Sequence, residues 1–211
     1  MDAEFFRAWI AEIAAVVEAK RDHLTQLDSA IGDADHGINL DRGFRAVQAA
    51  LAESDTPTPG SVLLVTGKTL ISKVGGASGP LYGTAFRRAA KTLGDKPEVD
   101  LPDLADALAA ALEGVKKLGA AVEGEKTMVD VLAPATAAFS KAVGEGATAP
   151  VAMAALTDAA DAGDRDTIEM QARKGRASYL GPRSVGHEDP GAASSALILH
   201  ALRDVSARQS A

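Results

Sequence analysis

Apolar residues recur along most of the chain at intervals of three or four, the spacing that places them on one face of an α-helix. In segment 4–20, Phe5, Trp9, Ile13 and Val16 form one such stripe and predict an amphipathic helix. The same spacing between breaker-rich turns predicts seven more helices, at about 38–51, 61–74, 80–94, 101–118, 127–143, 150–168 and 192–207. Ser61 and Pro80 are expected at the starts of the third and fourth helices, and Pro134 as a kink in the sixth.

No segment alternates like a half-buried strand; 62–65 is the only contender, and helical spacing through Val74 fits it better. Alanine is abundant, which favours helices. The connections are mostly short, so neighbouring helices should run antiparallel. We find no fixed-period repeat and no linker, so the sequence predicts an all-α fold with one domain over residues 1–211.

Charge and composition exclude several classes of function. The formal net charge of -7 argues against a nucleic-acid binder, which needs a basic face. The chain has no cysteine, which excludes disulfides, thiolate zinc sites and a cysteine nucleophile. It shows no signal sequence and no apolar run approaching the ~18 residues of a membrane span. We therefore expect a cytoplasmic protein that binds no membrane.

Three carboxylates, Asp28, Asp33 and Asp35, lie close together in a glycine-containing segment that we expect to lie off a regular helix. Carboxylates this close repel one another unless a cation compensates, and hard oxygen ligands suit magnesium or calcium. The twelfth residue counted from Asp33 is Phe44, not glutamate, so the segment is not an EF-hand loop. An acidic turn whose aspartates cap helices explains the spacing equally well.

The glycine-rich segment 75–80 leads into a predicted helix, where backbone N–H groups and the helix dipole could hold an anion. It lacks the Gly-Lys-Ser/Thr of a Walker A loop, and a plain helix connector is the commoner explanation.

A third segment, 172–191, carries Arg173, Lys174 and Arg176, cations that suit phosphate but also occur in solvated loops. His36 and His187 could carry protons, bind a ligand or simply make hydrogen bonds. Together the three segments supply a metal site, an anion site and cations, the parts that phosphoryl transfer requires.

Four segments, 27–39, 75–84, 125–130 and 172–191, closely resemble the nucleotide-binding L subunits of dihydroxyacetone kinases, in the same order and over essentially the whole chain. The resemblance implies an eight-helix antiparallel barrel or bundle with the nucleotide site at one end. It implies that Asp28, Asp33 and Asp35 hold two Mg²⁺ ions and act in catalysis with Arg176.

The resemblance also implies which residues line the site for ADP or ATP: His36, Gly37, Ile38, Asn39, Ala77, Ser78, Gly79, Gly119, Met128, Arg176, Asp189, Pro190 and Gly191. Two positions depart from the family pattern. Ala34 stands where glycine is frequent, and Glu125 stands where aspartate usually precedes Lys-Thr-Met. Neither is one of the implied metal ligands.

Because only the L portion is present, the resemblance implies a separate phosphotransferase subunit. Its retained ADP would be rephosphorylated by the M subunit of a phosphoenolpyruvate-dependent phosphotransferase system. The phosphoryl group would then pass to dihydroxyacetone, or another short ketose, held on a K subunit. A homodimer is compatible with this role. The alternatives are a subunit that exchanges ATP, a nucleotide-dependent regulatory binding module, and a fatty-acid kinase domain of related fold.

Overall fold

The computed structural model describes residues 1–209, which form eight α-helices and two 3₁₀ helices and contain no strand. The α-helices are α1 (Ala3–Ile31), α2 (His36–Glu53), α3 (Pro59–Lys73), α4 (Ser78–Leu93), α5 (Leu101–Gly119), α6 (Val129–Gly144), α7 (Ala149–Asp166) and α8 (Pro190–Gln209). The 3₁₀ helices are η1 (Thr167–Glu169) and η2 (Arg176–Ser184). The prediction of an all-α fold is confirmed.

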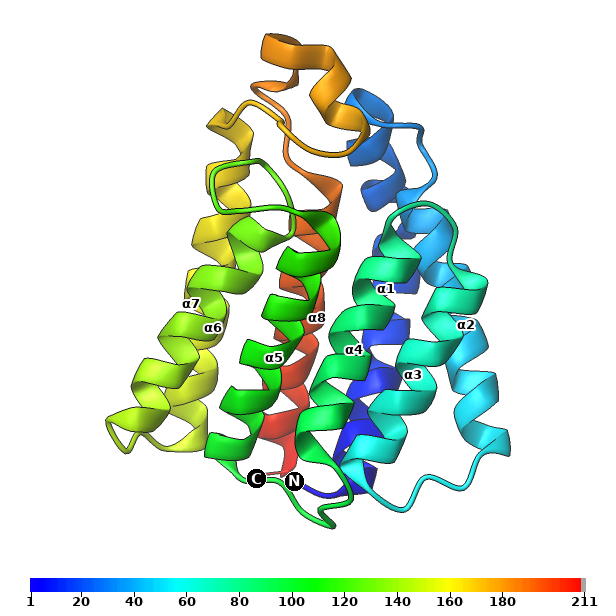
Figure 1. Ribbon diagram of the computed structural model, residues 1–211, viewed down its shortest axis with the longest axis vertical. Helices are drawn as coiled ribbons and strands as arrows, with labels where there is room; N and C mark the ends of the chain where they lie inside the picture. The colour runs from blue at the N-terminus through cyan, green and yellow to red at the C-terminus, as the bar shows by residue number, and fades with distance from the viewer. Residues whose placement is uncertain (210–211) are drawn as a thin grey trace.

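Neighbouring helices run up and down in sequence order, and α8 returns to pack against both α1 and α7 (Figure 1). One continuous apolar core contains buried residues from all eight α-helices, so the helices surround a shared interior. Aromatic side chains fill one part of it, where Phe6 and Phe86 both pack against Trp9. The indole N–H of Trp9 donates to the carbonyl oxygen of Ile198, which ties α1 to α8.

Glycines allow α3 and α4 to pack closely. A β-carbon at Gly67 would lie 2.6 Å from the carbonyl oxygen of Gly83, and one at Gly83 would lie 2.7 Å from that of Gly67. No side chain fits at such distances, so this contact fixes the position of α4, whose first turn forms part of the cavity described below.

The structure corrects three predicted helix starts or ends. Helix α1 continues to Ile31 rather than ending near residue 20, because Leu24 and Ile31 extend its buried face. Asp28 therefore lies in the last turn of α1 and not off a regular helix. Thr58, not Ser61, caps α3; Ser61 is the partner in a capping box. Helix α4 begins at Ser78 instead of Pro80.

The two ends of the barrel differ in Figure 1. The chain begins and α8 finishes at one end, with the α2–α3, α4–α5 and α6–α7 turns. The other end carries the α1–α2 and α3–α4 connections, the long α5–α6 loop and η2, which extends beyond the barrel. The basic segment between α7 and α8, for which the sequence predicts a loop over residues 173–191, thus contains a 3₁₀ helix, with a break at Gly181. None of the helices within residues 1–209 has the length and apolar character to cross a membrane.

Candidate nucleotide and metal site

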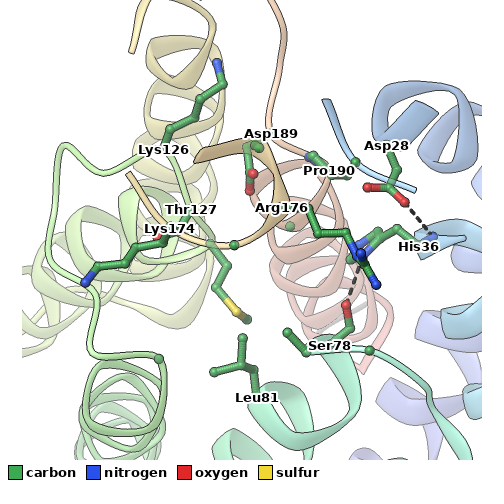
Figure 2. Close-up of a pocket in the computed structure, with 18 of the residues that line it drawn as sticks. Asp28, His36, Ser78, Leu81, Lys126, Thr127, Lys174, Arg176, Asp189 and Pro190 are labelled. Atoms are coloured by element: carbon green, nitrogen blue, oxygen red, sulfur yellow. Dashed lines mark hydrogen bonds between the residues drawn. The ribbon is translucent and has the colours of Figure 1, made fainter. Parts of the chain in front are cut away.

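A cavity of about 270 Å³ lies at the end of the barrel that carries η2. The end of α1, the starts of α2, α4 and α8, the loop before α6 and the start of η2 all contribute to its wall (Figure 2). One part of the wall is apolar, with Leu81, Val115 and Val129 beside Met128. The rest is polar and charged, so the cavity suits a ligand with one apolar and one anionic part.

The three carboxylates predicted as metal ligands converge in this cavity. Asp28, Asp33 and Asp35 each offer an oxygen atom, and these three atoms lie within 4.8 Å of one another. Asp28 is buried, and its Oδ2 accepts the backbone N–H groups of Asp35 (2.8 Å) and His36 (3.1 Å). These bonds hold the α1–α2 connection so that three like charges face one another. Such an arrangement of hard oxygen donors fits Mg²⁺.

The backbone of this connection is shaped for close approach. A β-carbon at Gly32 would lie 2.0 Å from Oδ1 of Asp28, so a side chain at this position would displace that carboxylate. Ala34, where glycine was expected from the resemblance, adopts a left-handed conformation with φ of 62°. A single left-handed alanine is strained but tolerable where the surrounding bonds fix it.

Arg176, at the start of η2, reaches across to the carboxylate cluster. Its Nε lies 2.7 Å from Oδ2 of Asp33, and the guanidinium side chain remains largely exposed. The ion pair therefore positions a cation at the cavity mouth without burying it, and the remaining N–H groups stay accessible to an anion.

The first turn of α4 supplies a second feature that suits an anion. Gly76 has a positive φ of 64°, Ala77 is the N-cap residue, and no side chain of the described residues caps this helix. Backbone N–H groups at an uncapped helix start favour phosphate oxygens, and the helix dipole adds to the attraction.

A buried polar cluster lies behind this turn. Nδ1 of His36 contacts Oγ of Ser78 at 3.0 Å, and Nε2 contacts Oγ of Ser194 at 2.8 Å (Figure 2 shows the first contact). Burial lowers the pKa of His36, although the charges of Asp28 and Asp35 act in the opposite direction. Burial also raises the pKa of Tyr82, whose hydroxyl contacts Ser194, to about 12.

The α5–α6 loop is held by Lys126, which is 1% exposed and has a left-handed φ of 61°. Its ammonium group donates to the carbonyl oxygens of Thr167 and His187. One buried cation thus joins three segments around the cavity. Desolvation lowers the pKa of Lys126, although Asp189 counteracts that effect.

Asp189 stands at the start of α8, where its Oδ2 accepts the N–H of Ala192 at 2.8 Å. Burial raises the pKa of this carboxyl to about 7, while the bond from Ala192 and the charge of Lys126 act in the opposite direction. The start of α8 is therefore fixed by a side chain whose ionisation is finely balanced near neutral pH.

Most of the predicted site residues line this one cavity: Asp28, Asp33, Asp35, His36, Ala77, Ser78, Gly119, Met128, Arg176, Asp189, Pro190 and Gly191. Four do not. Gly37 packs against α1, where a β-carbon would lie 2.0 Å from the carbonyl oxygen of Arg21, and Gly79 packs against Val74 in the same way. Ile38 points to an exposed groove, and Asn39 is buried and accepts a bond from Arg42. None of these four residues lines the cavity.

Sequence reasoning did not assign site roles to Lys126 or Tyr82, which also line the cavity. Lys126 lies in a segment that carries the family resemblance, so its position offered a signal. Tyr82 lies one helical turn after Ser78, and that spacing alone places both residues on one face of α4.

The barrel and its cavity together define a helical domain suited to hold an anionic ligand together with a divalent cation. Residues 30–204 match the DAK2 domain family. The ADP-binding subunit DhaL of PEP-dependent dihydroxyacetone kinase 1 from Listeria innocua is 43% identical over 201 residues, which cover 95% of this chain and 96% of the relative. The corresponding Escherichia coli subunit is 42% identical over 194 residues and 92% of each chain.

The chain thus belongs to the DAK2 family and, within it, to the DhaL group of ADP-binding subunits. Among solved structures, the dihydroxyacetone kinase of C. freundii in complex with AMP-PNP and Mg²⁺ superimposes with a TM-score of 0.74 at 25% identity. That match covers 97% of this chain and 34% of the kinase, so this chain spans about a third of that protein.

Proposed function

We propose that this chain is the ADP-binding subunit of a phosphoenolpyruvate-dependent dihydroxyacetone kinase. In this role it passes a phosphoryl group to dihydroxyacetone held on a separate K subunit, and an M subunit of the phosphotransferase system restores the nucleotide. The main support for this proposal is that the carboxylate cluster, the uncapped start of α4 and Arg176 all lie at one cavity. Two relatives that match over nearly their full length are ADP-binding subunits of such kinases.

Different residues of the cavity would bind different parts of the metal–nucleotide complex. Asp28, Asp33 and Asp35 would hold two Mg²⁺ ions, which neutralise phosphate charge during transfer. The backbone N–H groups at the start of α4 would receive phosphate oxygens, and Arg176 would add charge as the phosphoryl group moves. Met128 and Gly119, on the apolar side, would border the base. Gly191 lies beside Asp189 at the start of α8 and would close the site.

This role needs no nucleophile for the ketose carbonyl in this chain, because the substrate resides on the K subunit. The assembly is then cytoplasmic, where phosphoenolpyruvate is available. Native mass spectrometry of the purified chain tests the binding part directly. We expect one ADP and two Mg²⁺ ions to remain bound after extensive dialysis.

Reconstitution tests the catalytic part. With K and M subunits and phosphoenolpyruvate, the chain should support formation of dihydroxyacetone phosphate from catalytic amounts of ADP. Bound ADP without any triose phosphate would instead identify a nucleotide-dependent regulatory module.

A second candidate is an ATP-exchanging subunit. It is favoured by the similarity to the C. freundii kinase, which was solved with AMP-PNP and Mg²⁺. Rapid loss of ADP on dialysis, together with turnover on free ATP in the absence of the M subunit, would support this form over retained ADP.

A further inference from the structure

Helices α3 and α4 are basic, although the molecule as a whole is acidic. Segment 56–94, which contains both helices, holds five of the 22 lysine and arginine residues of the chain and none of its 29 aspartate and glutamate residues. The segment therefore has a formal charge of +5, and the rest of the chain has a charge of -12. The five cations are Lys68, Lys73, Arg87, Arg88 and Lys91.

These cations are free to meet a partner. All five side chains are exposed, and none of them forms an ion pair with a carboxylate of the described residues. Helices α3 and α4 lie side by side (Figure 1), and Arg87, Arg88 and Lys91 line one open groove with Leu64. Lys91 follows the two arginines by one helical turn, so the three charges gather on the outer face of α4. Asp95, beyond the end of α4, is the one acidic residue that lines this groove.

Two exposed apolar side chains lie among the cations. Leu64 is 37% and Ile71 is 38% exposed, and they lie two turns apart on α3. A β-carbon at Gly83 would lie 2.4 Å from Cγ1 of Ile71, and one at Gly67 would lie 2.6 Å from Cγ of Arg87. Ile71 and the stem of Arg87 thus lie in the seam between the helices, which limits their freedom before any partner binds. The five cations together with Leu64 and Ile71 are called the basic face below.

The composition of the basic face is typical of a protein–protein contact. Such contacts have an apolar centre and a polar rim, and arginine is enriched in them. Exposed charges at the rim chiefly raise the rate of association, and an apolar centre of only two side chains adds little lasting affinity. The basic face therefore suits a partner that arrives quickly and leaves again in every catalytic cycle.

Charge limits which partner can cover this face. A twofold dimer through the basic face would bring the same cations together, so a second copy of the chain does not suit it. A nucleic acid or an anionic membrane is an extended surface and would also meet the acidic remainder of the molecule. Both aromatic residues of α3 and α4, Tyr82 and Phe86, are buried, so the face offers no ring to insert among lipids or bases. An acidic protein surface meets none of these objections.

The position of the basic face relative to the cavity indicates which acidic protein it serves. Lys73 ends α3 three residues before Gly76, which lines the cavity at the uncapped start of α4. In the proposed function, the K subunit brings an uncharged ketose to this phosphate side, whereas the M subunit brings a negatively charged phosphoryl group. We propose that the basic face docks an acidic surface of the phosphorylated M subunit, an assignment that rests on the proposed function.

Charge reversal tests this docking surface against a matched control. Lys68→Glu combined with Lys91→Glu reverses two cations of the basic face. Lys20→Glu combined with Lys141→Glu makes the same change of net charge on α1 and α6, and all four lysines are exposed. Replacing Lys68 and Lys91 by glutamine removes the charges without reversing them, so this third variant should show a smaller effect of the same sign. Melting temperatures establish that each variant folds.

The measured quantity is the second-order rate constant for rephosphorylation of bound ADP by the phosphorylated M subunit, followed by quenched flow. At low ionic strength we expect a loss of about tenfold in the variant reversed at Lys68 and Lys91, and a smaller loss at high salt, because salt screens exposed charges. The control variant should stay within about twofold of wild type. Transfer from bound ATP to dihydroxyacetone on the K subunit should be unchanged in both variants.

Several results would overturn the inference. An equal loss in the control variant would show that net charge, and not the basic face, governs association. An unchanged rate in the reversed variant, a loss that persists at high salt, or a comparable loss in the reaction with the K subunit would also contradict it. A wild-type chain that the M subunit cannot rephosphorylate would refute the proposed function itself, and the docking assignment with it.

Discussion

The two ends of the barrel satisfy their helix starts in different ways. Helices α1, α3 and α5 begin at the end of the barrel where the chain starts. Each is capped by a side chain that accepts a backbone N–H three residues further along the chain; these caps are Asp2, Thr58 and Asp100. At the cavity end the first N–H groups of α2 bond to Asp28, which comes from a different helix, and α4 has no side-chain cap within the described residues. Two helices are exceptions. Helix α7 begins at the first end, and Thr148 makes no side-chain cap. Helix α8 begins at the cavity end and is capped locally by Asp189, which accepts from Ala192.

This difference between the two ends bears on which residues determine stability and which determine ligand binding. Local caps form as soon as a helix forms, so the starts of α1, α3 and α5 need no distant partner for their caps. The cavity end depends on distant partners, such as Lys126 with Thr167 and His187, and on donors that only a ligand would satisfy. We therefore expect substitutions at the cavity end to affect binding and stability together, and those at the other end to affect stability alone.

The largest effect should come from Asp28→Ala, which removes a metal ligand and the acceptor for the start of α2. Phosphoryl transfer in the reconstituted system should fall at least about 100-fold, since bound metal contributes several kcal/mol to such reactions. Asp28→Asn is the matched control. It keeps an oxygen that can accept from Asp35 and His36, so it should melt near the wild-type temperature and still lose Mg²⁺. Normal transfer by either variant would mean that Asp28 binds no metal.

The next largest effect should come from Lys126→Met, which retains the apolar stem but loses the bonds to Thr167 and His187. Hydrogen bonds from a charged group contribute about 1.5–3 kcal/mol each, so we expect a loss of about 3 kcal/mol in the free energy of unfolding, measured by urea denaturation. The affinity for ADP should fall as well. A stability loss with unchanged ADP affinity would mean that the bonds of Lys126 stabilise the fold but do not affect the shape of the cavity.

The same division between local and distant contacts explains what the sequence could predict. Seven helices were placed within a few residues of their observed positions because apolar spacing and Gly or Pro breakers are local signals. The sequence does not predict the extension of α1 to Ile31, because polar residues such as Gln26 and Ser29 lie on the exposed face of its last turns. Only the packing of Leu24 and Ile31 shows that the helix continues.

For the site, the carboxylates and glycines could be selected from the sequence because their chemistry is visible in neighbouring residues. The family resemblance then supplied the assignment of roles. The buried contacts of His36 with Ser194, and of Lys126 with Thr167, join residues far apart in the chain. Nothing in the local sequence marks such pairs, so they could be found only from the fold.

Asp189 should give a smaller, pH-dependent effect. Its pKa is about 7 in the folded protein against an ordinary value of 3.8, so the folded state holds a proton that the unfolded state has lost over this range. Stability contributed by that proton is present at low pH and declines as pH rises from about 4 to about 7. In Asp189→Asn, measured without nucleotide, the decline between pH 5 and pH 7 should be smaller by up to about 2 kcal/mol.

Asp164, whose pKa is raised by burial to about 8, contributes with the same sign. The charge of Asp189 helps to raise the pKa of Asp164, so Asp189→Asn also reduces the contribution of Asp164, and urea unfolding at the two pH values reports both changes together. Parallel pH profiles for wild type and Asp189→Asn would show that the carboxyl is ionised throughout and that the start of α8 is not balanced near neutral pH.

The smallest effect should come from Thr58→Ala at the end opposite the cavity. Thr58 and Ser61 exchange hydrogen bonds in a capping box of α3, and removing one cap costs about 1 kcal/mol, or about 2–4 °C in Tm for a chain of this size. The affinity for Mg·ADP, measured by calorimetry, should stay within about twofold of wild type, because no bond of this turn reaches the cavity. A tenfold loss of affinity in a variant that loses so little stability would show that the two ends are energetically coupled through α3 and α4, whose glycine contact would then transmit the change to the start of α4.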